Sequence, residues 1–324
     1  MTIDTLVIGA GWAGLTAARA TASAGRNVVV LEKARGAGGR SATRRGDGSC
    51  FDHGAQYFTA RSAAFGRQLQ QWQDAGLAQL WRPRLAVIGD KSAHGNPEQV
   101  SRFVAVPGMN SVCRHLASGL DCRYEQRVSA LQFDSHWHVE LESGDRLQAR
   151  RLLITAPPKQ AAALLGESDP LHGELAGIAF NPCIAGLLSF KKNFDPGFDA
   201  AFVNRPGALS WVASNSSKPG REGNDWVLHA TADWSRALLE APVDQQAEQL
   251  ADAFDALIGE SLPATANCTA HRWRYAQACD PLERGIIVDE SRRLAVAGDW
   301  LSGSRVEGAW TSGRKAGEWL AHID

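Results

Sequence analysis

A glycine pattern close to the amino terminus constrains the fold of this chain more than any other feature. Gly9, Gly11 and Gly14 form G-x-G-x-x-G between an apolar run over residues 3–8 and an alanine-rich segment that ends near Gly25. The first glycine allows a tight turn, the second lets the backbone approach a pyrophosphate, and the third lets a helix pack closely on a strand. The free N–H groups and the dipole at a helix start favour negative charge. The pattern therefore predicts a dinucleotide site between a strand and a helix.

The segment after this helix indicates which dinucleotide is bound. A second apolar run, residues 28–31, ends in Glu32, about 20 residues beyond the glycines, where a carboxylate can accept hydrogen bonds from ribose hydroxyls. A glycine-rich loop over residues 35–43 follows and includes Gly39 and Arg40. Glycines leave backbone N–H groups bare, which suits a second pass along a diphosphate. Because an NAD-binding unit usually enters its next helix at once, this loop favours FAD.

These motifs together resemble a known group of flavoproteins. The sequences GAGWAG and GGRSAT, with Glu32 between them, resemble the two-dinucleotide-binding flavoproteins of the amine oxidase superfamily. The resemblance implies an α/β fold, with a Rossmann-like FAD domain and an inserted substrate domain made of an antiparallel sheet plus helix. We expect a discontinuous FAD domain over residues 1–65, 97–165 and 268–324, and a substrate domain over residues 66–96 and 166–267.

Composition excludes several other classes of protein. The 324 residues carry a net charge of −1, with 44% hydrophobic and 21% charged residues, as in ordinary globular proteins. The balanced charge argues against a nucleic-acid partner, and no apolar run reaches the roughly 18 residues that a membrane span needs. Because a strand begins at Ile3, a signal peptide is not expected. We expect a cytoplasmic protein without a membrane partner.

Cysteine and histidine spacing predicts neither disulfides nor a metal site. The six cysteines are scattered without a C-x-x-C pair, which is typical of free thiols in a reducing cytoplasm. His136 and His138 share one face of a predicted hairpin, but two ligands do not complete a zinc site. We interpret both as surface histidines.

Hydrophobic periodicity predicts the elements around these motifs. Strands are expected at 77–88, 120–126, 128–133, 137–141, 146–149, 151–156, 180–190, 208–214, 226–231 and 293–297. Helices are expected at 62–75, 111–118 and 244–258. The last of these helices is strongly amphipathic, with Leu250, Phe254 and Ile258 on one face. The short strands form a meander before a strand stopped by prolines, an order that resembles the flavin domain of the superfamily.

The carboxyl-terminal segment is expected to return to the cofactor. Gly298-Asp299 follows the strand predicted at 293–297, and a last helix opens around residues 305–310. In the superfamily, an aspartate at this place binds the ribityl-phosphate arm, and the next helix start points at the N1/O2 edge of the flavin. Reduced flavin is negatively charged at this edge, so a helix N-terminus suits it.

Three further segments resemble the renalase family, in its bacterial type. They are DHGAQYFT at 52–59, HRWRYAQ at 271–277 and AGDW followed by RVEGAWTSGRKAGEWL at the end of the chain. The resemblance implies an FAD-dependent oxidase that takes a hydride from 2- or 6-dihydro isomers of NAD(P)H, gives NAD(P)+, and reduces O2 to hydrogen peroxide. Such a reaction needs no acid–base residue, because the dihydropyridine becomes an aromatic cation when it loses hydride.

The motifs and the resemblance select a set of cofactor-binding residues. They are Gly9, Gly11, Ala13, Gly14, Glu32, Lys33, Gly39, Arg40, Ala55, Gln56, Val128, Asp299, Val306, Gly308 and Ala309. The helix-entry segment SGSRVEGAW contains no cysteine that could tether a flavin. We therefore expect non-covalent FAD. Superfamily amine oxidases usually place a lysine near flavin N5, but we interpret Lys191 and Lys192 as surface charges.

The substrate pocket is predicted from aromatic and polar residues near the expected flavin ring. The candidates are Gln56, Tyr57, Trp211, Trp273 and Arg274, with Tyr57 or Trp273 as the ring that stacks on a nicotinamide. Core packing is the alternative role of each aromatic residue, and a surface salt bridge is the alternative role of Arg274. The expected partners are a dinucleotide substrate and O2. Two other functions stay open: a flavin amine or polyamine oxidase, and a non-catalytic flavin-fold binding protein. The preferred isomer, NAD or NADP, and the oligomeric state are also open.

Overall fold

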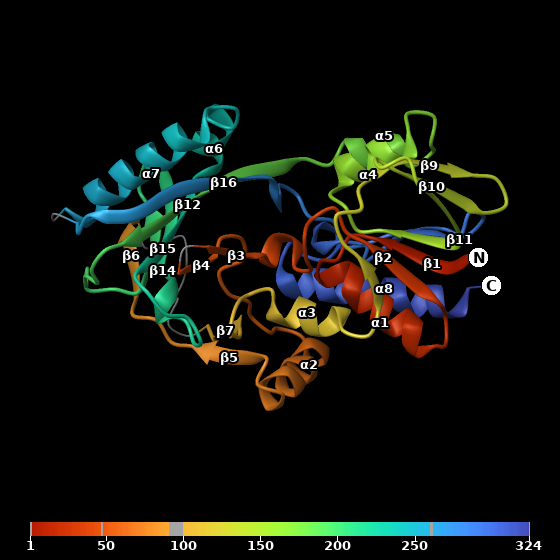
Figure 1. The fold of residues 1–324 in the computed structure, drawn as a ribbon, viewed down its shortest axis with the longest axis horizontal. Coiled ribbons are helices and arrows are strands. Elements are labelled where there is room, and N and C mark those ends of the chain that lie inside the picture. Colours follow the sequence, from red (N-terminus) through yellow and green to blue (C-terminus); the bar gives the residue numbers. More distant parts are fainter. Residues whose placement is uncertain (1, 47, 91–99, 260–261, 324) are drawn as a thin grey trace.

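The structure is a computed structural model that describes residues 2–46, 48–90, 100–259 and 262–323. The chain forms two lobes, one on an eight-stranded sheet and the other on a six-stranded sheet (Figure 1). A short hairpin, β3 (Thr43–Gly46) and β4 (Ser49–Asp52), lies between the lobes. The predicted α/β architecture, with a Rossmann-like lobe and an antiparallel sheet-plus-helix lobe, is confirmed.

The first sheet is the dinucleotide-binding sheet that the glycine pattern predicts. Its path runs β17-β18-β11-β1-β2-β8, and β9 and β10 extend it beside β11. The bounds are β1 (Ile3–Ile8), β2 (Val28–Leu31), β8 (Asp121–Arg123), β9 (Val128–Phe133), β10 (Trp137–Leu141), β11 (Arg146–Ile154), β17 (Ile287–Asp289) and β18 (Leu294–Val296). β1 pairs in parallel with both β2 and β11. Both faces of these strands are buried, which explains why they read as continuous apolar runs.

Helices cover both faces of this sheet. On one face, α1 (Trp12–Ser23), α3 (Ser111–Ala117) and α8 (Val306–His322) lie together, and α4 (Pro158–Leu165) and α5 (His172–Ala176) lie on the other (Figure 1). α1 and α8 pack very closely, because a Cβ on Gly313 would stand 2.2 Å from the carbonyl oxygen of Ala13. Gly317 makes the same kind of approach to Ala17. The small residues of α8 thus allow two backbones to touch.

One long strand replaces two predicted ones. Separate strands were expected at 146–149 and 151–156, but β11 runs without a break from Arg146 to Ile154 and ends two residues before the second expected end. Its first half pairs antiparallel with β10, and its second half pairs in parallel with β1 and β18. The meander and the nucleotide-binding sheet are therefore one continuous sheet.

The second lobe is a six-stranded sheet in the order β16-β12-β15-β14-β13-β6. Its strands are β6 (Leu85–Gly89), β12 (Phe180–Phe190), β13 (Ala200–Asn204), β14 (Leu209–Ser214), β15 (Asp225–Ala230) and β16 (Thr265–Ala278). Two helices, α6 (Ala232–Ala237) and α7 (Val243–Ile258), lie on one face (Figure 1). On the opposite face, Ala185, Leu187 and Val227 pack against Phe51 of the central hairpin. This second face is the side that meets the flavin lobe.

Three expected boundaries differ from the observed elements. The predicted boundary at 267/268 falls inside β16, which stays in the six-stranded sheet as far as Ala278. The boundary at 65/66 cuts α2 (Ala63–Asp74), whose Phe65 packs on Trp310 of α8 at 5.3 Å between ring centroids. The strand predicted at 77–88 is two strands, β5 (Ala78–Trp81) and β6, which belong to different sheets. The boundary at 96/97 lies outside the described residues.

No helix in the described ranges is both long and apolar enough to cross a membrane.

Candidate flavin and substrate site

The three glycines of the first loop meet three different spatial demands. A Cβ on Gly9, whose φ is +108°, would lie 2.5 Å from Thr155 Oγ1, and a Cβ on Gly14 would lie 2.0 Å from the carbonyl oxygen of Gly9. The fold itself therefore requires these two glycines. A Cβ on Gly11 would meet only the Cα of Gly39, at 4.0 Å. Gly11 keeps open space, as a ligand-facing glycine should.

The second glycine-rich loop lies directly against the first. A Cβ on Gly39 would stand 3.3 Å from the Cα of Gly11, and the Gly38 N–H donates to the Ala10 carbonyl at 2.9 Å. The start of α1 has no side-chain cap, so the N–H groups of its first turn, including that of Ala13, face the same region. Two bare backbone segments and a helix start form a cradle that fits a diphosphate.

The carboxylate of Glu32 is buried and held by backbone donors at the adenosine end of this cradle. One oxygen accepts from the Ala10 N–H and the other from the Ala34 N–H, both at 2.8 Å, and the residue is 7% exposed. Each carboxylate oxygen has a second lone pair, so Glu32 can also accept from ribose hydroxyls. Lys33 donates to Gln160 at 3.1 Å, and burial lowers its pKa. Val128 is buried at the start of β9, near the Gln126 N–H that donates to the Glu32 carbonyl.

An ion pair joins the second glycine loop to the carboxyl-terminal segment. Arg40 donates to both oxygens of Asp299, at 3.0 and 2.5 Å, and also to the Ala276 carbonyl at 3.2 Å. Asp299 lies between β18 and α8, so its bond to Arg40 connects this segment to the second glycine loop. The adjacent Trp300 has a buried indole N–H that finds no acceptor within the described ranges. An orphaned buried donor at this position fits a ligand with polar edges.

The start of α8 is left open for a ligand. Its N-cap, Arg305, makes no side-chain cap, and Glu307 accepts instead from the Arg61 and Ser62 N–H groups, at 2.9 and 2.8 Å, at the start of α2. Gly308 fits only without a side chain, because its Cβ would lie 2.2 Å from the Ser302 carbonyl oxygen. The first-turn N–H groups of Val306 and Gly308 therefore keep the partial positive charge of a helix start.

The predicted pocket residues separate into three places. Tyr57, Trp81 and Trp211 form an aromatic cluster, with Tyr57 5.8 Å from Trp211 and 6.2 Å from Trp81 between ring centroids. Trp273 lies in a second group, where it stacks on His53 at 5.1 Å and donates to the His53 carbonyl at 2.9 Å. Arg274 comes next to Trp273 on β16 and so points to the opposite face of the sheet, where it pairs with Glu240. The structure does not bring Arg274 to the other candidates.

The tight segment that carries Gln56 is also packed against the second glycine loop. The Ala55 N–H donates to the Arg40 carbonyl at 2.9 Å, and a Cβ on Gly54 would lie 1.9 Å from that same oxygen. Gln56 donates to the carbonyls of Asp52 and Gly54. Ala55 and Gln56 are therefore held between the flavin cradle and the aromatic cluster.

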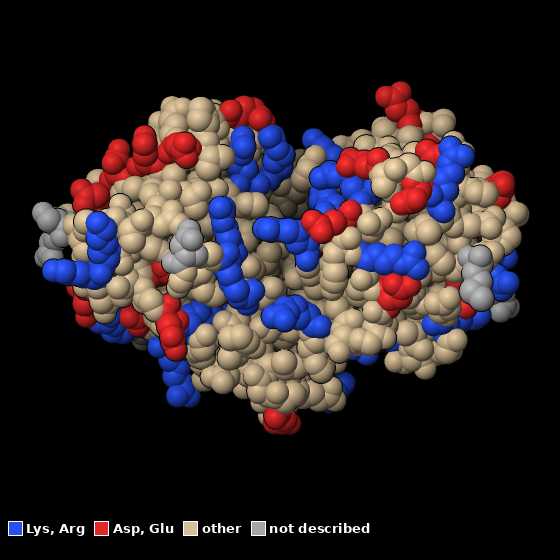
Figure 2. All heavy atoms as spheres, viewed as in Figure 1, with Lys and Arg blue, Asp and Glu red and all other residues tan. Residues whose placement is uncertain are grey.

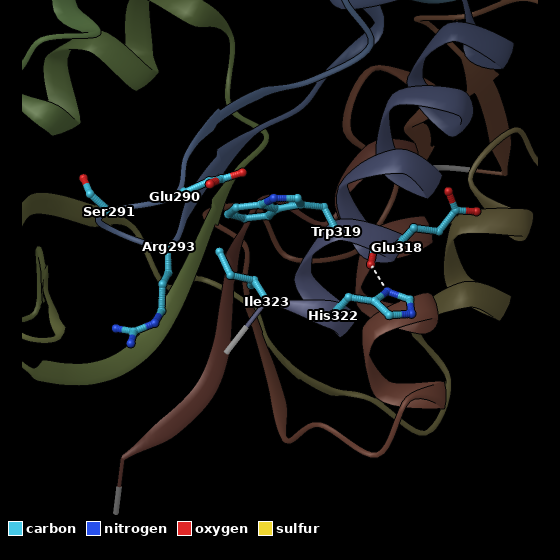
Figure 3. Close-up of a pocket in the computed structure, with 7 residues that line it drawn as sticks. All are labelled: Glu290, Ser291, Arg293, Glu318, Trp319, His322 and Ile323. Carbon is cyan, nitrogen blue, oxygen red and sulfur yellow. Dashed lines mark hydrogen bonds between the residues drawn. The ribbon is translucent and has the colours of Figure 1, made fainter.

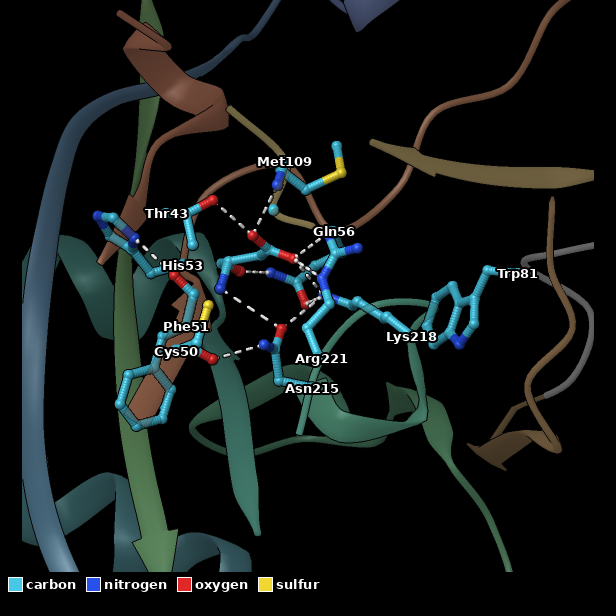
Figure 4. Close-up of polar contacts among 12 residues, drawn as sticks. Thr43, Cys50, Phe51, His53, Gln56, Trp81, Met109, Asn215, Lys218 and Arg221 are labelled. Atoms are coloured by element: carbon cyan, nitrogen blue, oxygen red, sulfur yellow. Dashed lines mark hydrogen bonds and ion pairs between the residues drawn. The ribbon is translucent and has the colours of Figure 1, made fainter. Parts of the chain in front are cut away.

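A buried charged network behind Gln56 is absent from the sequence prediction (Figure 4). The Asp52 carboxylate accepts from Arg221 at 2.6 and 3.0 Å, from the Met109 N–H at 2.8 Å and from Thr43 at 2.7 Å. Lys218 donates to Gln56 Oε1 at 3.1 Å and to Asn215 Oδ1 at 3.0 Å. The side chains of Asp52, Lys218 and Arg221 are 0% exposed.

The protonation states in this region follow from burial and charge. Burial lowers the pKa of Lys218 to about 8. Burial acts to raise the pKa of Asp52, but Lys218 and Arg221 outweigh it and hold the pKa below its ordinary value. Burial also lowers the pKa of His53, His229 and His271 to about 4. At neutral pH the three histidines are uncharged, and Asp52 is ionised.

A surface hollow at the far end of α8 is separate from this region (Figure 3). It has a volume of about 590 Å³ and is lined by Glu290, Ser291, Arg293, Glu318, Trp319, His322 and Ile323. These residues surround the last turns of α8, whereas the flavin cradle faces its first turn. A helix of 17 residues is roughly 25 Å long, so the hollow is remote from the cofactor.

No cluster of three or more His, Cys, Asp and Glu suited to a metal ion occurs in the described part of the chain. The six cysteines are free thiols. The two histidines predicted on the hairpin surface have different partners. His138 pairs with Asp134 at 3.0 Å, and the His136 ring lies within hydrogen-bond distance of the Ser135 hydroxyl, at 3.1 Å.

Comparison with known proteins identifies the class to which this fold and cradle belong. Residues 75–318 match the flavin-containing amine oxidoreductase family, and residues 7–72 match an NAD(P)-binding Rossmann-like domain. The chain belongs to the flavin-containing amine oxidoreductase family. FAD is accordingly its cofactor, and the bare glycines, the Glu32 carboxylate and the open start of α8 are suited to hold it.

Solved structures share the fold over the whole length of the chain. A chain from Exiguobacterium sp. 255-15, provisionally named a protoporphyrinogen oxidase, has a TM-score of 0.76 and 14% identity, and the match covers 99% of both chains. Putrescine oxidase bound to putrescine has a TM-score of 0.74 and 13% identity, with 98% of each chain covered. A double mutant of putrescine oxidase matches at a TM-score of 0.74 and 14% identity, over 99% of this chain and 100% of the other. At these identities the likeness establishes the fold.

Proposed function

We propose that this flavoprotein is a renalase-type oxidase that converts 2- or 6-dihydro isomers of NAD(P)H into NAD(P)+, with O2 as the electron acceptor. Overall, one dihydropyridine, one O2 and one proton give one pyridinium and one hydrogen peroxide. Bound FAD supplies a two-electron acceptor for the hydride. The protein residues then have to bind and orient a flat ring, and no side chain has to remove a proton from it.

The charge around the aromatic cluster is the observation that carries this proposal. Arg102 lies over the Tyr57 ring at 5.2 Å, and Lys218 lies over the Trp81 ring at 5.6 Å. The nearby carboxylate, Asp52, is already bound by Arg221. Positive charge behind a group of aromatic rings favours a neutral ring that is attached to anionic phosphates. It disfavours a protonated amine.

Two further observations agree with a phosphate-bearing, carboxamide-bearing substrate. The indole N–H of Trp211 is buried without an acceptor among the described residues, so it is available to a carbonyl oxygen such as that of a nicotinamide. Figure 2 shows a hollow between the two lobes with Lys and Arg side chains gathered on both sides. Positive charge around a cleft attracts anionic ligands. Tyr57 is the proposed stacking ring, with Trp273 and Gln56 fixing the neighbouring backbone.

Amine oxidation is the second candidate, because the family and the putrescine oxidase structures favour it. The two candidates differ in the charge of the reacting group. An amine oxidase has to accept an amine that is protonated in water, whereas a dihydropyridine ring is neutral. The positive charge behind Tyr57 and Trp81 argues for the neutral ring.

The test is anaerobic mixing of the holoprotein with a panel of reductants while the flavin absorbance is followed. We expect 2- or 6-dihydro-NAD(P) to bleach the flavin in one fast phase, and ordinary 4-dihydro-NAD(P)H to be much slower because its hydride leaves from a different ring carbon. Tyr57→Ala should slow the reduction or raise the substrate concentration needed. Fast bleaching by putrescine or catecholamines, with no response to any dihydronicotinamide, would establish the amine oxidase instead.

A further inference from the structure

We propose that Lys218 is a specificity-determining residue: its buried ammonium gives the aromatic pocket a fixed positive charge that rejects cationic rings and ammonium groups. The proposal rests on the proposed site and extends it to the choice between substrate and product. The proposal rests on one observation. The buried ammonium of Lys218 is held by the neutral oxygens of Gln56 and Asn215, and its ion pair with Asp52 is long.

Lys218 shares its ion-pair partner, Asp52, with Arg221, which lies closer to the carboxylate. Asp52 lies 3.8 Å from the Lys218 nitrogen, beyond hydrogen-bond distance, and its oxygens accept from Arg221, Met109 and Thr43. One carboxylate and two cations give the network a net charge of +1. The oxygens of Gln56 and Asn215 hold the ammonium in place but are uncharged. Because Arg221 is the closer partner of Asp52, Lys218 is the less compensated of the two cations.

In the proposed site, Trp81 lies between this charge and the other aromatic rings. The Lys218 nitrogen lies 5.6 Å from the centre of the Trp81 ring, and Trp81 packs on Tyr57 at 6.2 Å and Trp211 at 6.4 Å. Lys218 also holds Gln56, the residue before Tyr57 in the chain. Because water is excluded from Lys218, its charge is weakly screened. At about 10 Å and an effective dielectric constant near 20, a unit charge changes the affinity for a cation on the order of tenfold.

The proposed reaction changes the charge of the nicotinamide ring. The charge of Lys218 should therefore affect the substrate and the product differently. The ring of a dihydro-NAD isomer is neutral, and the ring of the NAD+ product is a cation. The phosphates are the same in both, so their attraction cancels in the comparison. A fixed positive charge behind the wall therefore favours substrate over product and promotes product release.

The test compares the binding of two small rings of nearly equal size to the FAD-loaded protein, followed through the change in flavin absorbance. 1-Methylnicotinamide carries a permanent positive charge, and nicotinamide is neutral. In Lys218→Met the affinity for the cation, relative to the neutral ring, should rise on the order of tenfold. Lys218→Arg keeps the charge and should keep the wild-type ratio. If Lys218 had only a structural role, Lys218→Met would weaken the binding of both ligands and leave the ratio of their affinities unchanged. That result in a folded Lys218→Met protein would overturn the proposal.

A second measurement uses the wild-type protein alone. The groups around Lys218 are Asp52 and Cys50 on β4, Arg221 on its own segment and His229 on β15. Burial raises the pKa of Cys50, Asp52 is ionised and His229 is neutral above pH 7, so Lys218 is the group expected to titrate near pH 8. Rejection of 1-methylnicotinamide should weaken as the pH rises from 7 to about 9. A ratio that stays constant across this interval would contradict the proposal.

These probes also separate this inference from the proposed function. Neither ring is oxidised or reduced by the flavin in the assay, so the affinity ratio does not depend on dihydronicotinamide turnover. If the flavin is bleached by amines alone but the Lys218→Met ratio changes as expected, the proposed substrate is wrong and the charge role stands. If dihydronicotinamide isomers bleach the flavin but the affinity ratio of Lys218→Met stays at the wild-type value, the charge role is wrong and the proposed substrate stands.

Discussion

The cofactor cradle and the substrate wall are built in different ways. The cradle is made mostly of backbone from two short stretches, residues 9–14 and 36–41, with one side chain, Glu32, at its end. The proposed substrate wall is made of side chains from distant segments, such as Tyr57, Trp81 and Trp211, with Lys218 behind them. A backbone cradle tolerates almost any sequence that keeps the glycines. A side-chain wall can change its ligand with a single substitution. The difference explains how one fold can keep one cofactor and serve many substrates.

Removal of the buried carboxylate should have the largest effect on the substrate side. Asp52→Asn leaves Arg221 and Lys218 as two cations without a counter-charge in a dry interior. We expect it to lower the free energy of unfolding by about 3–5 kcal/mol. Chemical denaturation of the holoprotein measures this. Asp255→Asn is the matched control, because that residue is exposed on α7 and its change should stay within about 0.5 kcal/mol. Equal effects of both substitutions would show that the network does not hold the lobes together.

The two kinds of glycine in the cradle should respond differently to the same added methyl group. Gly14→Ala forces a Cβ to 2.0 Å from a carbonyl oxygen, so we expect a loss of about 1–3 kcal/mol in stability even without FAD. Gly11→Ala has open space in the protein and should fold normally but retain FAD poorly. Thermal unfolding of the apoprotein and FAD titration separate the two effects. A Gly11→Ala protein that binds FAD like the wild type would mean that Gly11 does not face the pyrophosphate.

The adenosine end of the cradle should depend on one side chain. Glu32→Ala removes a charged acceptor for ribose hydroxyls, which is worth roughly 1.5–3 kcal/mol of FAD binding. Equilibrium titration with FAD should show the dissociation constant rising accordingly. Thr2→Ala is an exposed control on the same lobe and should leave the constant unchanged. Unaltered FAD affinity in Glu32→Ala would place the adenosine elsewhere.

Mild acid should weaken the substrate side gradually. The pKa of His53, His229 and His271 is about 4 in the folded chain, against an ordinary value of 6.5. Between these values the unfolded chain binds protons that the folded chain does not, so the free energy of unfolding decreases as the pH falls from about 6.5 to about 4. Each histidine contributes up to about 1.4 kcal/mol per pH unit in this window. Denaturation curves at several pH values test this, and His229→Gln should show a shallower slope.

The outcome of the sequence analysis follows the same division between backbone and side chains. The glycine loops, Glu32 and the start of α8 could be proposed from the sequence because each demand is local: a turn, a close approach or a helix start is specified within a few residues. The network of Asp52, Lys218 and Arg221 was not found. Its partners are separated by about 165 residues, and the segment SNSSKPGRE reads as an ordinary polar turn. No local pattern signals that such a turn will be buried between two lobes.

The alternation of side chains along a strand explains why Arg274 was wrongly placed in the pocket and why β16 was not predicted. Trp273 and Arg274 are neighbours in the chain, and both were assigned to the pocket, but successive side chains on a strand point to opposite faces. Arg274 therefore reaches Glu240 on the helix-covered face. β16 was not predicted because its polar and aromatic residues lack a clean alternation of apolar and polar positions. Only the two sheet faces, one against α7 and one against the flavin lobe, account for that composition.

The close packing of α1 on α8 has a consequence for the length of the cofactor. In the expected placement of FAD, the two helix starts serve different parts of the dinucleotide: the α1 start serves the pyrophosphate in its middle, and the α8 start serves the flavin ring at one end. Since Gly313 and Gly317 bring these helices into backbone contact, the distance between the two anchoring points is set by rigid helices and not by loops. The flavin lobe therefore selects a cofactor whose length matches this fixed distance. A flavin mononucleotide has a ring for the α8 start but no pyrophosphate for the α1 start, so discrimination between the two flavins is expected to depend on this helix pair as well as on the groups that contact the ligand.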